Sequence, residues 1–253
     1  MSQRQHLQNF CNPSENFTQI SSYETNRDTL LASLRDSSSL GTYSNATIGL
    51  TPDFVYGIFL CRGDTLGTAI SCADCIQTAT IEIATNCSLN KAAIIYYQKC
   101  MVRYSSFPFF TLMETYTRIG LTHNKPAPNL YRFNQTLFDK FDQLILNVSS
   151  SSPIPYFVED QELVTQPEGS YELESMVQCS PDLDLSNCTV CLRDALFRIS
   201  ICCSSPSIAQ VFTPKCILWY KTTVSPSPSV SSISAASTVA ASFFIAATAT
   251  EYS

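Results

Sequence analysis

The sequence contains one pattern of cysteines twice. The repeated positions are Cys72, Cys75, Cys87 and Cys100, and then Cys188, Cys191, Cys203 and Cys216. Each cysteine of the second set lies 116 residues after its counterpart, and a further pair, Cys61 and Cys179, is 118 residues apart. A register kept over so many cysteines predicts two copies of one module, each with the same covalent framework.

The length and the cysteine content agree with two extracellular modules. The chain has 253 residues, and domains of about 100 residues bury a core of their own. Its 12 cysteines, without Cys/His metal spacing, favour an oxidising compartment over the cytosol. The net charge of −6 disfavours nucleic acid as a partner. Candidate glycosylation sites are Asn16, Asn45, Asn86, Asn134, Asn147 and Asn187.

Both ends of the chain differ in composition from the modules. The first ten residues lack the apolar run of a secretory signal, so we expect one to be encoded in frame upstream of Met1. Residues 224–253 form a Ser/Pro/Ala-rich tail. Its uncharged stretch, 233–250, is shorter than the ~20 residues of a spanning helix. We therefore expect membrane contact only if this tail anchors the chain, which leaves the plasma membrane as the alternative location.

The apolar pattern predicts the same elements in each module. One helix should follow Asn26 and its counterpart should follow Asn134, because leucines and phenylalanines recur there at helical spacing. A second helix should run from Ser71, whose hydroxyl can cap it, to about residue 86, and its counterpart from 186 to about 201. Strand-like runs are 55–60, 92–97, 101–104, 208–212 and 217–220. These elements indicate an α+β fold.

Each second helix carries a Cys-x2-Cys pair in its first turn, and three interpretations are open. The four cysteines Cys72, Cys75, Cys188 and Cys191 match the ligand set of a zinc site, although the other cysteines repeat just as faithfully. A thioredoxin-like redox pair needs a parallel-sheet context that the pattern does not show. In the third interpretation each cysteine bonds outward to a strand and clamps the helix to the sheet, which the repeated framework favours.

The cysteine spacing and its flanking residues resemble a known family. The pattern Cys179-x8-Cys188-x2-Cys191 and the segments Cys61-Arg-Gly-Asp64 and Cys100-Met-Val-Arg-Tyr104 are similar to the ginkbilobin-homologous (stress-antifungal) domain. Tandem copies form plant cysteine-rich repeat secretory proteins and the ectodomains of cysteine-rich receptor-like kinases. The resemblance covers about residues 5 to 222. It implies two tandem disulfide-stapled modules, each with two helices packed on a five-stranded antiparallel sheet.

The resemblance also implies how the cysteines pair. The implied bridges are Cys11–Cys87, Cys61–Cys72, Cys75–Cys100, Cys179–Cys188 and Cys191–Cys216. Module two has no cysteine equivalent to Cys11, so Cys203 lacks its expected partner, and an extra Cys202 precedes it. A bridge between these neighbours is disfavoured, since adjacent Cα atoms lie only ~3.8 Å apart. A buried thiol and an intermolecular link remain open for this pair.

A sugar site is implied only in part. The mannose-binding member of the family uses an Asn after the first cysteine, an Arg before the last cysteine and a Glu after it. Module one keeps the first position as Asn12, but Ile94 and Ser105 occupy the other two. Module two offers Gln210 and Lys221 there. We therefore expect weak mannose binding, with Asn12 as the carbohydrate-binding candidate.

Catalysis finds little support in the sequence. The two histidines, His6 and His123, fall in the N-terminal tail and the linker, away from any Ser or Cys nucleophile. Acidic residues Glu159, Asp160 and Glu162 read as the solvated face of a loop. No phosphate-binding loop occurs either. From these observations together we expect no enzyme activity and no cofactor. We expect no metal, because the Cys/His spacing of a metal site is absent from the sequence.

The sequence predicts a secreted, non-catalytic binding module. The family resemblance implies that it acts in the plant apoplast, in stress or defence, by antifungal, carbohydrate or partner recognition. Its expected partner is an extracellular glycan or protein. The predicted domains are 1–112 and 118–223, followed by the tail. Two alternatives remain: the ectodomain, or a truncated copy, of a cysteine-rich receptor-like kinase, and a thiol oxidoreductase.

Overall fold

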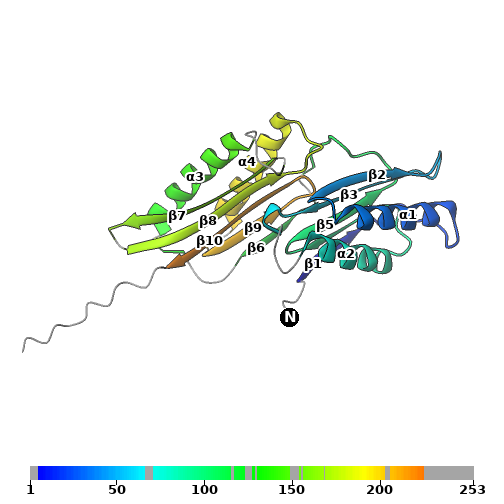
Figure 1. Cartoon of the computed structure of the whole chain (residues 1–253), viewed down its shortest axis with the longest axis horizontal. Coiled ribbons are helices and arrows are strands. Elements are labelled where there is room, and N and C mark those ends of the chain that lie inside the picture. Colours follow the sequence, from blue (N-terminus) through cyan, green and yellow to red (C-terminus); the bar gives the residue numbers. More distant parts are fainter. Residues whose placement is uncertain are drawn as a thin grey trace, which may run out of the picture.

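Each half of the chain folds as one antiparallel sheet with two helices on one face (Figure 1). The computed structural model describes residues 5–65, 71–114, 117–122, 127–128, 130–148, 154, 156–167, 169–202 and 206–224. In module one the elements are β1 (His6–Cys11), α1 (Ser22–Ser37), β2 (Tyr43–Ile48), β3 (Val55–Cys61), α2 (Cys72–Asn86), β4 (Ala93–Tyr97) and β5 (Cys100–Ser105). Its strand order is β1-β4-β5-β3-β2.

Module two repeats this plan. Its elements are β6 (Ile119–Thr122), α3 (Leu130–Asn147), β7 (Phe157–Gln166), β8 (Gly169–Cys179), α4 (Leu185–Cys202), β9 (Ile208–Phe212) and β10 (Cys216–Val224). The strand order β6-β9-β10-β8-β7 is that of module one with equivalent strands in equivalent places. The predicted fold class, α+β with two helices on each five-stranded antiparallel sheet, is confirmed.

Local sequence signals set the helix ends. The hydroxyl of Ser71 accepts a hydrogen bond from the Asp74 amide at 3.2 Å, so α2 begins as predicted. Helix α4 begins one residue earlier than predicted, because Asp184 is the capping residue and accepts from the Asn187 amide at 2.8 Å. The predictions that the first helices follow Asn26 and Asn134 are both wrong, since α1 already begins at Ser22 and α3 at Leu130.

Two segments read as irregular from the sequence are strands. The acidic residues of the expected loop lie in β7, where Lys140 from α3 forms ion pairs with Asp160 and with Glu162, the latter at 2.8 Å. His6 is not in a tail: it begins β1 and its ring packs edge-on against Tyr97. His123 and the tail 225–253 lie outside the described residues. Within the described part, no helix is long and apolar enough to cross a membrane.

Alternate residues of the central strands face two different cores. In β3, Phe59 points to α1 and α2, whereas its neighbours Ile58 and Leu60 point to the opposite face of the sheet. This is the two-residue period of a strand, but here both faces are apolar and buried. The helix-side cores therefore account for only one face of each sheet.

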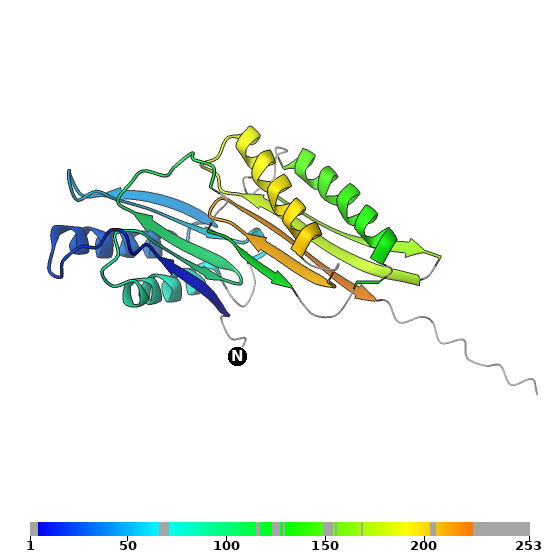
Figure 2. The same ribbon diagram turned by 180° about the vertical axis from the view of Figure 1, so that it is seen from behind.

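The second faces of the two sheets pack against each other. The core between the modules contains Ile58, Leu60, Ile94, Tyr96, Met101, Phe109, Ile119, Ile154, Phe157, Met176, Phe212 and Ile217. The rings of Tyr96 and Phe212 meet edge to face across it, with centroids 5.2 Å apart. Seen from the opposite side, the two modules lie next to each other along the long axis, each with its own pair of helices (Figure 2).

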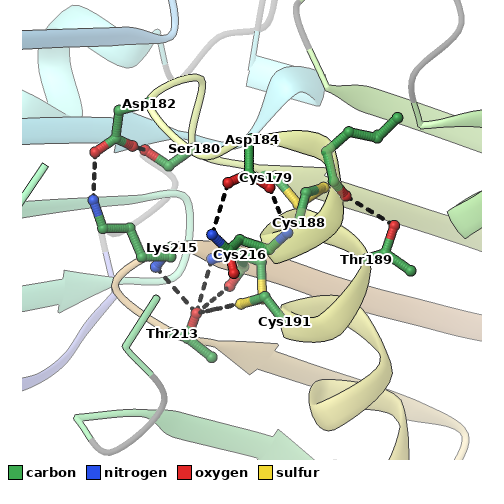
Figure 3. Close-up of a disulfide and its surroundings, with 12 residues drawn as sticks. Cys179, Ser180, Asp182, Asp184, Cys188, Thr189, Cys191, Thr213, Lys215 and Cys216 are labelled. Carbon is green, nitrogen blue, oxygen red and sulfur yellow. Dashed lines mark hydrogen bonds and ion pairs between the residues drawn. A yellow bond between two sulfur atoms is a disulfide. The ribbon is translucent and has the colours of Figure 1, made fainter. Parts of the chain in front are cut away.

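Five disulfides of the described residues link α2 and α4 to their sheets. Module one contains Cys11–Cys87, Cys61–Cys72 and Cys75–Cys100, and module two contains Cys179–Cys188 and Cys191–Cys216. These are the pairings that the family resemblance implies. In each module the two cysteines of the Cys-x2-Cys pair bond to different strands, as Figure 3 shows for α4. Cys202 ends α4, and Cys203 lies outside the described residues.

We predict that protein made through a secretory pathway contains these five bridges. Each should stabilise the fold by about 3 kcal/mol, because a cross-link restricts the unfolded chain. The double variant Cys75→Ser/Cys100→Ser should lose about that amount in denaturant unfolding. Peptide mapping of alkylated, unreduced protein gives the pairing, and six or more free thiols would contradict the framework.

Gly63 provides a test of the contact between the modules. A Cβ added there would lie 2.4 Å from the Phe157 ring of module two, whereas a Cβ at Gly41 would meet no atom within 4 Å. Gly63→Ala should therefore cost about 1–3 kcal/mol through overpacking. Gly41→Ala is the matched control and should leave the free energy of unfolding unchanged or slightly higher. Equal stability of the two variants in urea unfolding would show that the modules do not pack as described.

Candidate functional site

The interface between the modules, called the joint here, contains a buried arginine that bonds to both modules. Arg62, which follows β3, is 2% exposed. Its guanidinium donates two hydrogen bonds to Asp64, at 3.0 and 2.9 Å, and one to Gln210 of module two at 2.8 Å. It also lies 4.6 Å from the ring centroid of Trp219. Because the guanidinium uses its hydrogen bonds and its ring contact within the protein, Arg62 joins the modules rather than facing a ligand.

Asp64 is the acidic partner of Arg62 at this joint, and its carboxylate favours the charged form. Burial alone would raise the pKa of Asp64, but the cations of Arg62 and Lys99 beside it hold that pKa below its usual value. Gln178 of module two adds two bonds across the joint: its amide donates to the Cys61 carbonyl at 2.9 Å and accepts from the Gly63 amide at 2.8 Å. The joint therefore combines an apolar core with buried polar groups that are hydrogen-bonded to each other.

The sugar positions of module two take part in structural contacts. Gln210 is buried in the joint, where it accepts from Arg62 and donates to the Gln98 carbonyl at 3.3 Å. Lys221 forms an ion pair with Glu174 at 2.6 Å on the neighbouring strand. These two residues of module two therefore do not converge on a ligand.

Module one has a cavity at the equivalent place. Its volume is about 400 Å³, and it lies over the ends of β1, β4 and β5. The lining residues are Phe10, Cys11, Asn12, Ala92, Ala93, Ile94, Arg103, Tyr104, Ser105, Glu114 and Thr117. The three positions expected from the resemblance, Asn12, Ile94 and Ser105, are thus brought together at one cavity.

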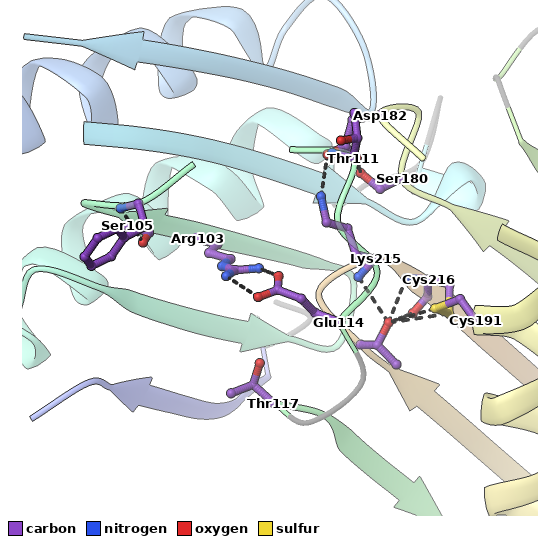
Figure 4. A network of polar contacts seen from close by, with 12 residues as sticks. Arg103, Ser105, Thr111, Glu114, Thr117, Ser180, Asp182, Cys191, Lys215 and Cys216 are labelled. Carbon is purple, nitrogen blue, oxygen red and sulfur yellow. Dashed lines mark hydrogen bonds and ion pairs between the residues drawn. A yellow bond between two sulfur atoms is a disulfide. The ribbon is translucent and has the colours of Figure 1, made fainter. Parts of the chain in front are cut away.

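The charged groups of this cavity come from two other positions. Arg103, on β5, donates to the Glu114 carboxylate through its two terminal guanidinium nitrogens (Figure 4). The contact of Nη2 is 2.8 Å long. The guanidinium also lies 3.8 Å from the ring centroid of Phe109. Glu114 lies beyond β5 and is 8% exposed. A planar guanidinium paired with a carboxylate offers donors and an acceptor side by side.

The remaining polar groups of the cavity are held in local turns. The side chain of Asn12 accepts from the Ser14 amide at 3.0 Å, which is the turn geometry common for Asn before such a bend. The Ser105 hydroxyl accepts from the Phe107 amide at 3.0 Å. Burial raises the pKa of Tyr104 to about 12, so its hydroxyl stays protonated at neutral pH.

Arg103 and Glu114 were not predicted from the sequence, although one signal for Arg103 existed. Ile94 and Arg103 are direct partners across the β4–β5 ladder. A positive charge expected on β4 therefore lies one strand away, on the same face of the sheet. Glu114 had no such signal, because it lies nine residues beyond the predicted position Ser105 in a segment without regular structure.

The disulfide geometry decides between the three interpretations of the Cys-x2-Cys pairs. Cys72 and Cys75 are bonded to Cys61 and Cys100, with Cα separations of 5.7 and 6.2 Å. They form neither a bridge with each other nor a thiolate set for zinc. The structure thus has the clamping arrangement in which each cysteine bonds outward to a strand.

The candidate glycosylation sites lie at the surface of both modules. Five of them are exposed, namely Asn16, Asn45, Asn86, Asn134 and Asn147. Asn187 is half-buried and donates to the Asp184 carboxylate at 2.8 Å. Exposure is what a transferase needs, so the first five remain candidates on structural grounds.

Comparison with known proteins identifies the family. A family model described as salt stress response/antifungal matches residues 10–107 and 123–223. Cysteine-rich repeat secretory protein 9 of Arabidopsis thaliana is 65% identical over 233 residues, which cover 91% of this chain and 71% of that protein. The putative cysteine-rich repeat secretory protein 7 of the same plant is 63% identical over 228 residues, covering 90% of this chain and 79% of that protein.

Solved structures show the same tandem fold. The tandem DUF26 ectodomain of the Arabidopsis thaliana cysteine-rich receptor-like protein PDLP8 superposes with a TM-score of 0.67 at 26% identity, covering 87% of this chain and 98% of that one. The ectodomain of PDLP5 gives a TM-score of 0.64 at 24% identity, covering 85% and 98%. The chain therefore belongs to the salt stress response/antifungal family, as a secreted extracellular protein built from two tandem copies of its domain.

Proposed function

We propose that this protein is a non-catalytic recognition module of plant stress or defence that binds a saccharide in the cavity of module one. The observation that carries the proposal is the Arg103–Glu114 pair, which lines the cavity. The family is a cysteine-rich secretory and ectodomain module rather than a known class of enzyme.

The chemistry of the cavity suits a neutral polyol. A sugar hydroxyl both donates and accepts, so it can give its proton to the Glu114 carboxylate while its oxygen accepts from Arg103. The side chain of Ile94 offers an apolar surface to the C–H face of a pyranose. A charged ligand fits less well, because the two charges of the cavity already neutralise each other.

A second cavity, of about 430 Å³, is less suited to recognition. It lies beside Trp219 and is lined by several carboxylates, of which Asp64, Asp160 and Glu174 already pair with Lys or Arg. Its lining contains carboxylates but no Lys or Arg, whereas the cavity of module one offers both the donors of Arg103 and the acceptor Glu114. We therefore place the proposed binding function in module one.

Two further functions keep one supporting observation each. The likeness to receptor-like ectodomains supports a role as the sensing part of a receptor, or as a truncated copy of one, with a protein or glycan ligand. The Cys-x2-Cys pairs remain the basis for a thiol oxidoreductase. Their separate bridges to different strands weigh against it, because a redox pair must bond internally.

The domain boundaries are proposed from the sheets. We propose domains at 1–112 and 118–223, followed by the tail 224–253. This division is supported by β6, Ile119–Thr122, which pairs with β9 and so belongs to the second sheet. The family model matches from residue 123 onward. Cys202 and Cys203 stay without an assigned partner, and all six sequons stay proposed sites.

Titration with a panel of methyl glycosides tests the saccharide proposal. Methyl α-mannoside, glucoside, galactoside and xyloside are added to the full chain while binding is followed by calorimetry and by NMR. We expect at least one to bind with a Kd near 1 mM, about −4 kcal/mol. Glu114→Gln should weaken that binding about tenfold or more, since a hydrogen bond to a charged group contributes about 1.5–3 kcal/mol.

Two variants serve as controls for this titration. Glu174→Gln removes an ion-paired carboxylate outside the cavity and should leave the affinity unchanged. Asn12→Ala should change it little, because the Asn12 side chain is already bonded to the Ser14 amide. If no glycoside of the panel binds, or if Glu114→Gln binds as well as the unaltered protein, the saccharide proposal is wrong.

A further inference from the structure

Glu114 is delivered to the cavity by a segment that touches both modules. This segment, residues 107–114, follows β5 and is called the strap here. At its beginning the Phe107 amide is bonded to Ser105, a cavity residue of module one. At its end Glu114 pairs with Arg103, and between these points the strap passes Asp182 and Lys215 of module two (Figure 4).

Module two presents a buried ion pair to the strap. The Lys215 side chain is fully buried and its ammonium is bonded to Asp182, whose side chain is 6% exposed. Asp182 also accepts from the Ser180 hydroxyl and, at 3.3 Å, from the backbone amide of Thr111 in the strap. A buried pair of this kind has few alternative arrangements, since moving either charge leaves the other unpaired.

Phe109 connects this ion pair to the cavity. Phe109 is 3% exposed, and its ring contacts two cations, the Arg103 guanidinium of module one at 3.8 Å and the Lys215 ammonium of module two at 5.4 Å from the ring centroid. Two cation–π contacts to one buried aromatic ring help to hold the ring in place. The position of the Arg103 guanidinium is thus fixed partly by a residue that module two holds.

The backbone of the strap is in a conformation that needs support. Thr111 has a φ of 63°, the left-handed region that a β-branched residue rarely adopts. Such a conformation persists only when its surroundings determine it. The bond from the Thr111 amide to Asp182 is the contact that module two supplies at this residue.

We propose that module two completes the ligand cavity of module one. Asp182 and Lys215 are positioning residues: they hold Phe109 and Thr111, so that Glu114 meets Arg103 at the cavity wall. The saccharide ligand rests on the proposed function, whereas the positioning of Glu114 by module two does not. A single module would accordingly lack an ordered Glu114 and would bind poorly even with its own fold intact.

The test combines hydrogen exchange with the glycoside titration in the full chain. The double variant Asp182→Asn/Lys215→Met removes both charges without leaving one of them buried and unpaired. Amides of residues 107–114 should exchange about tenfold faster or more, because local opening becomes easier while the core of α1 and α2 keeps its protection. Affinity for the best methyl glycoside should fall about tenfold with the loss of the ordered carboxylate.

Two comparisons separate positioning from general stability. The variant Glu174→Gln/Lys221→Met removes another ion pair of module two, one that does not touch the strap, and should leave both readouts unchanged. Lys215→Arg keeps the charge and should restore protection of the strap at least in part. Unchanged exchange in the strap, an equal rise throughout the protein, or unchanged glycoside affinity would each overturn the inference. Faster exchange in the strap alone, with no glycoside binding to the unaltered protein, would uphold the positioning and refute the saccharide.

Discussion

The packing of two bare sheet faces is the constraint on which the structure depends. Each module covers one face of its sheet with two helices, and the other face also carries buried apolar residues. An exposed face of that kind would be a large apolar patch in water. The two modules remove it by packing these faces together, with Tyr96 and Phe212 at the contact and Arg62 hydrogen-bonded beside it. The two modules together, rather than either module alone, therefore bury the apolar surface of both sheets.

The same contact explains why two copies of one module differ in their sites. Ile94 and Gln210 are equivalent positions, 116 residues apart, on β4 and β9. Gln210 is bonded to Arg62 across the joint and so cannot face a ligand. Ile94 also touches the core between the modules, but it lies at the edge of that core and lines the open cavity. Duplication thus gave one copy a mainly structural surface and left a cavity on the other.

The sequence was most informative where structure is local or covalent. The duplicated cysteines and the capping Ser71 predicted the modules and α2, because spacing and capping act over a few residues. The long hairpin of β7 and β8 was not found, since the acidic residues of β7 resemble those of a loop and their ion pairs with Lys140 depend on tertiary contact. Glu114 was missed for the same reason: only the strap's path across module two brings it to Arg103.

The placement of the disulfides has a consequence for how the cavity is maintained. All five bridges of the described residues join elements within one module, and none joins the two modules. Helices α2 and α4 are therefore fixed covalently, whereas the strap depends on hydrogen bonds, an ion pair and ring contacts. Non-covalent contacts of this size can open locally while the modules stay folded. The geometry of the cavity is thus more open to change by a ligand, or by a substitution at the joint, than the packing of the disulfide-linked helices α2 and α4.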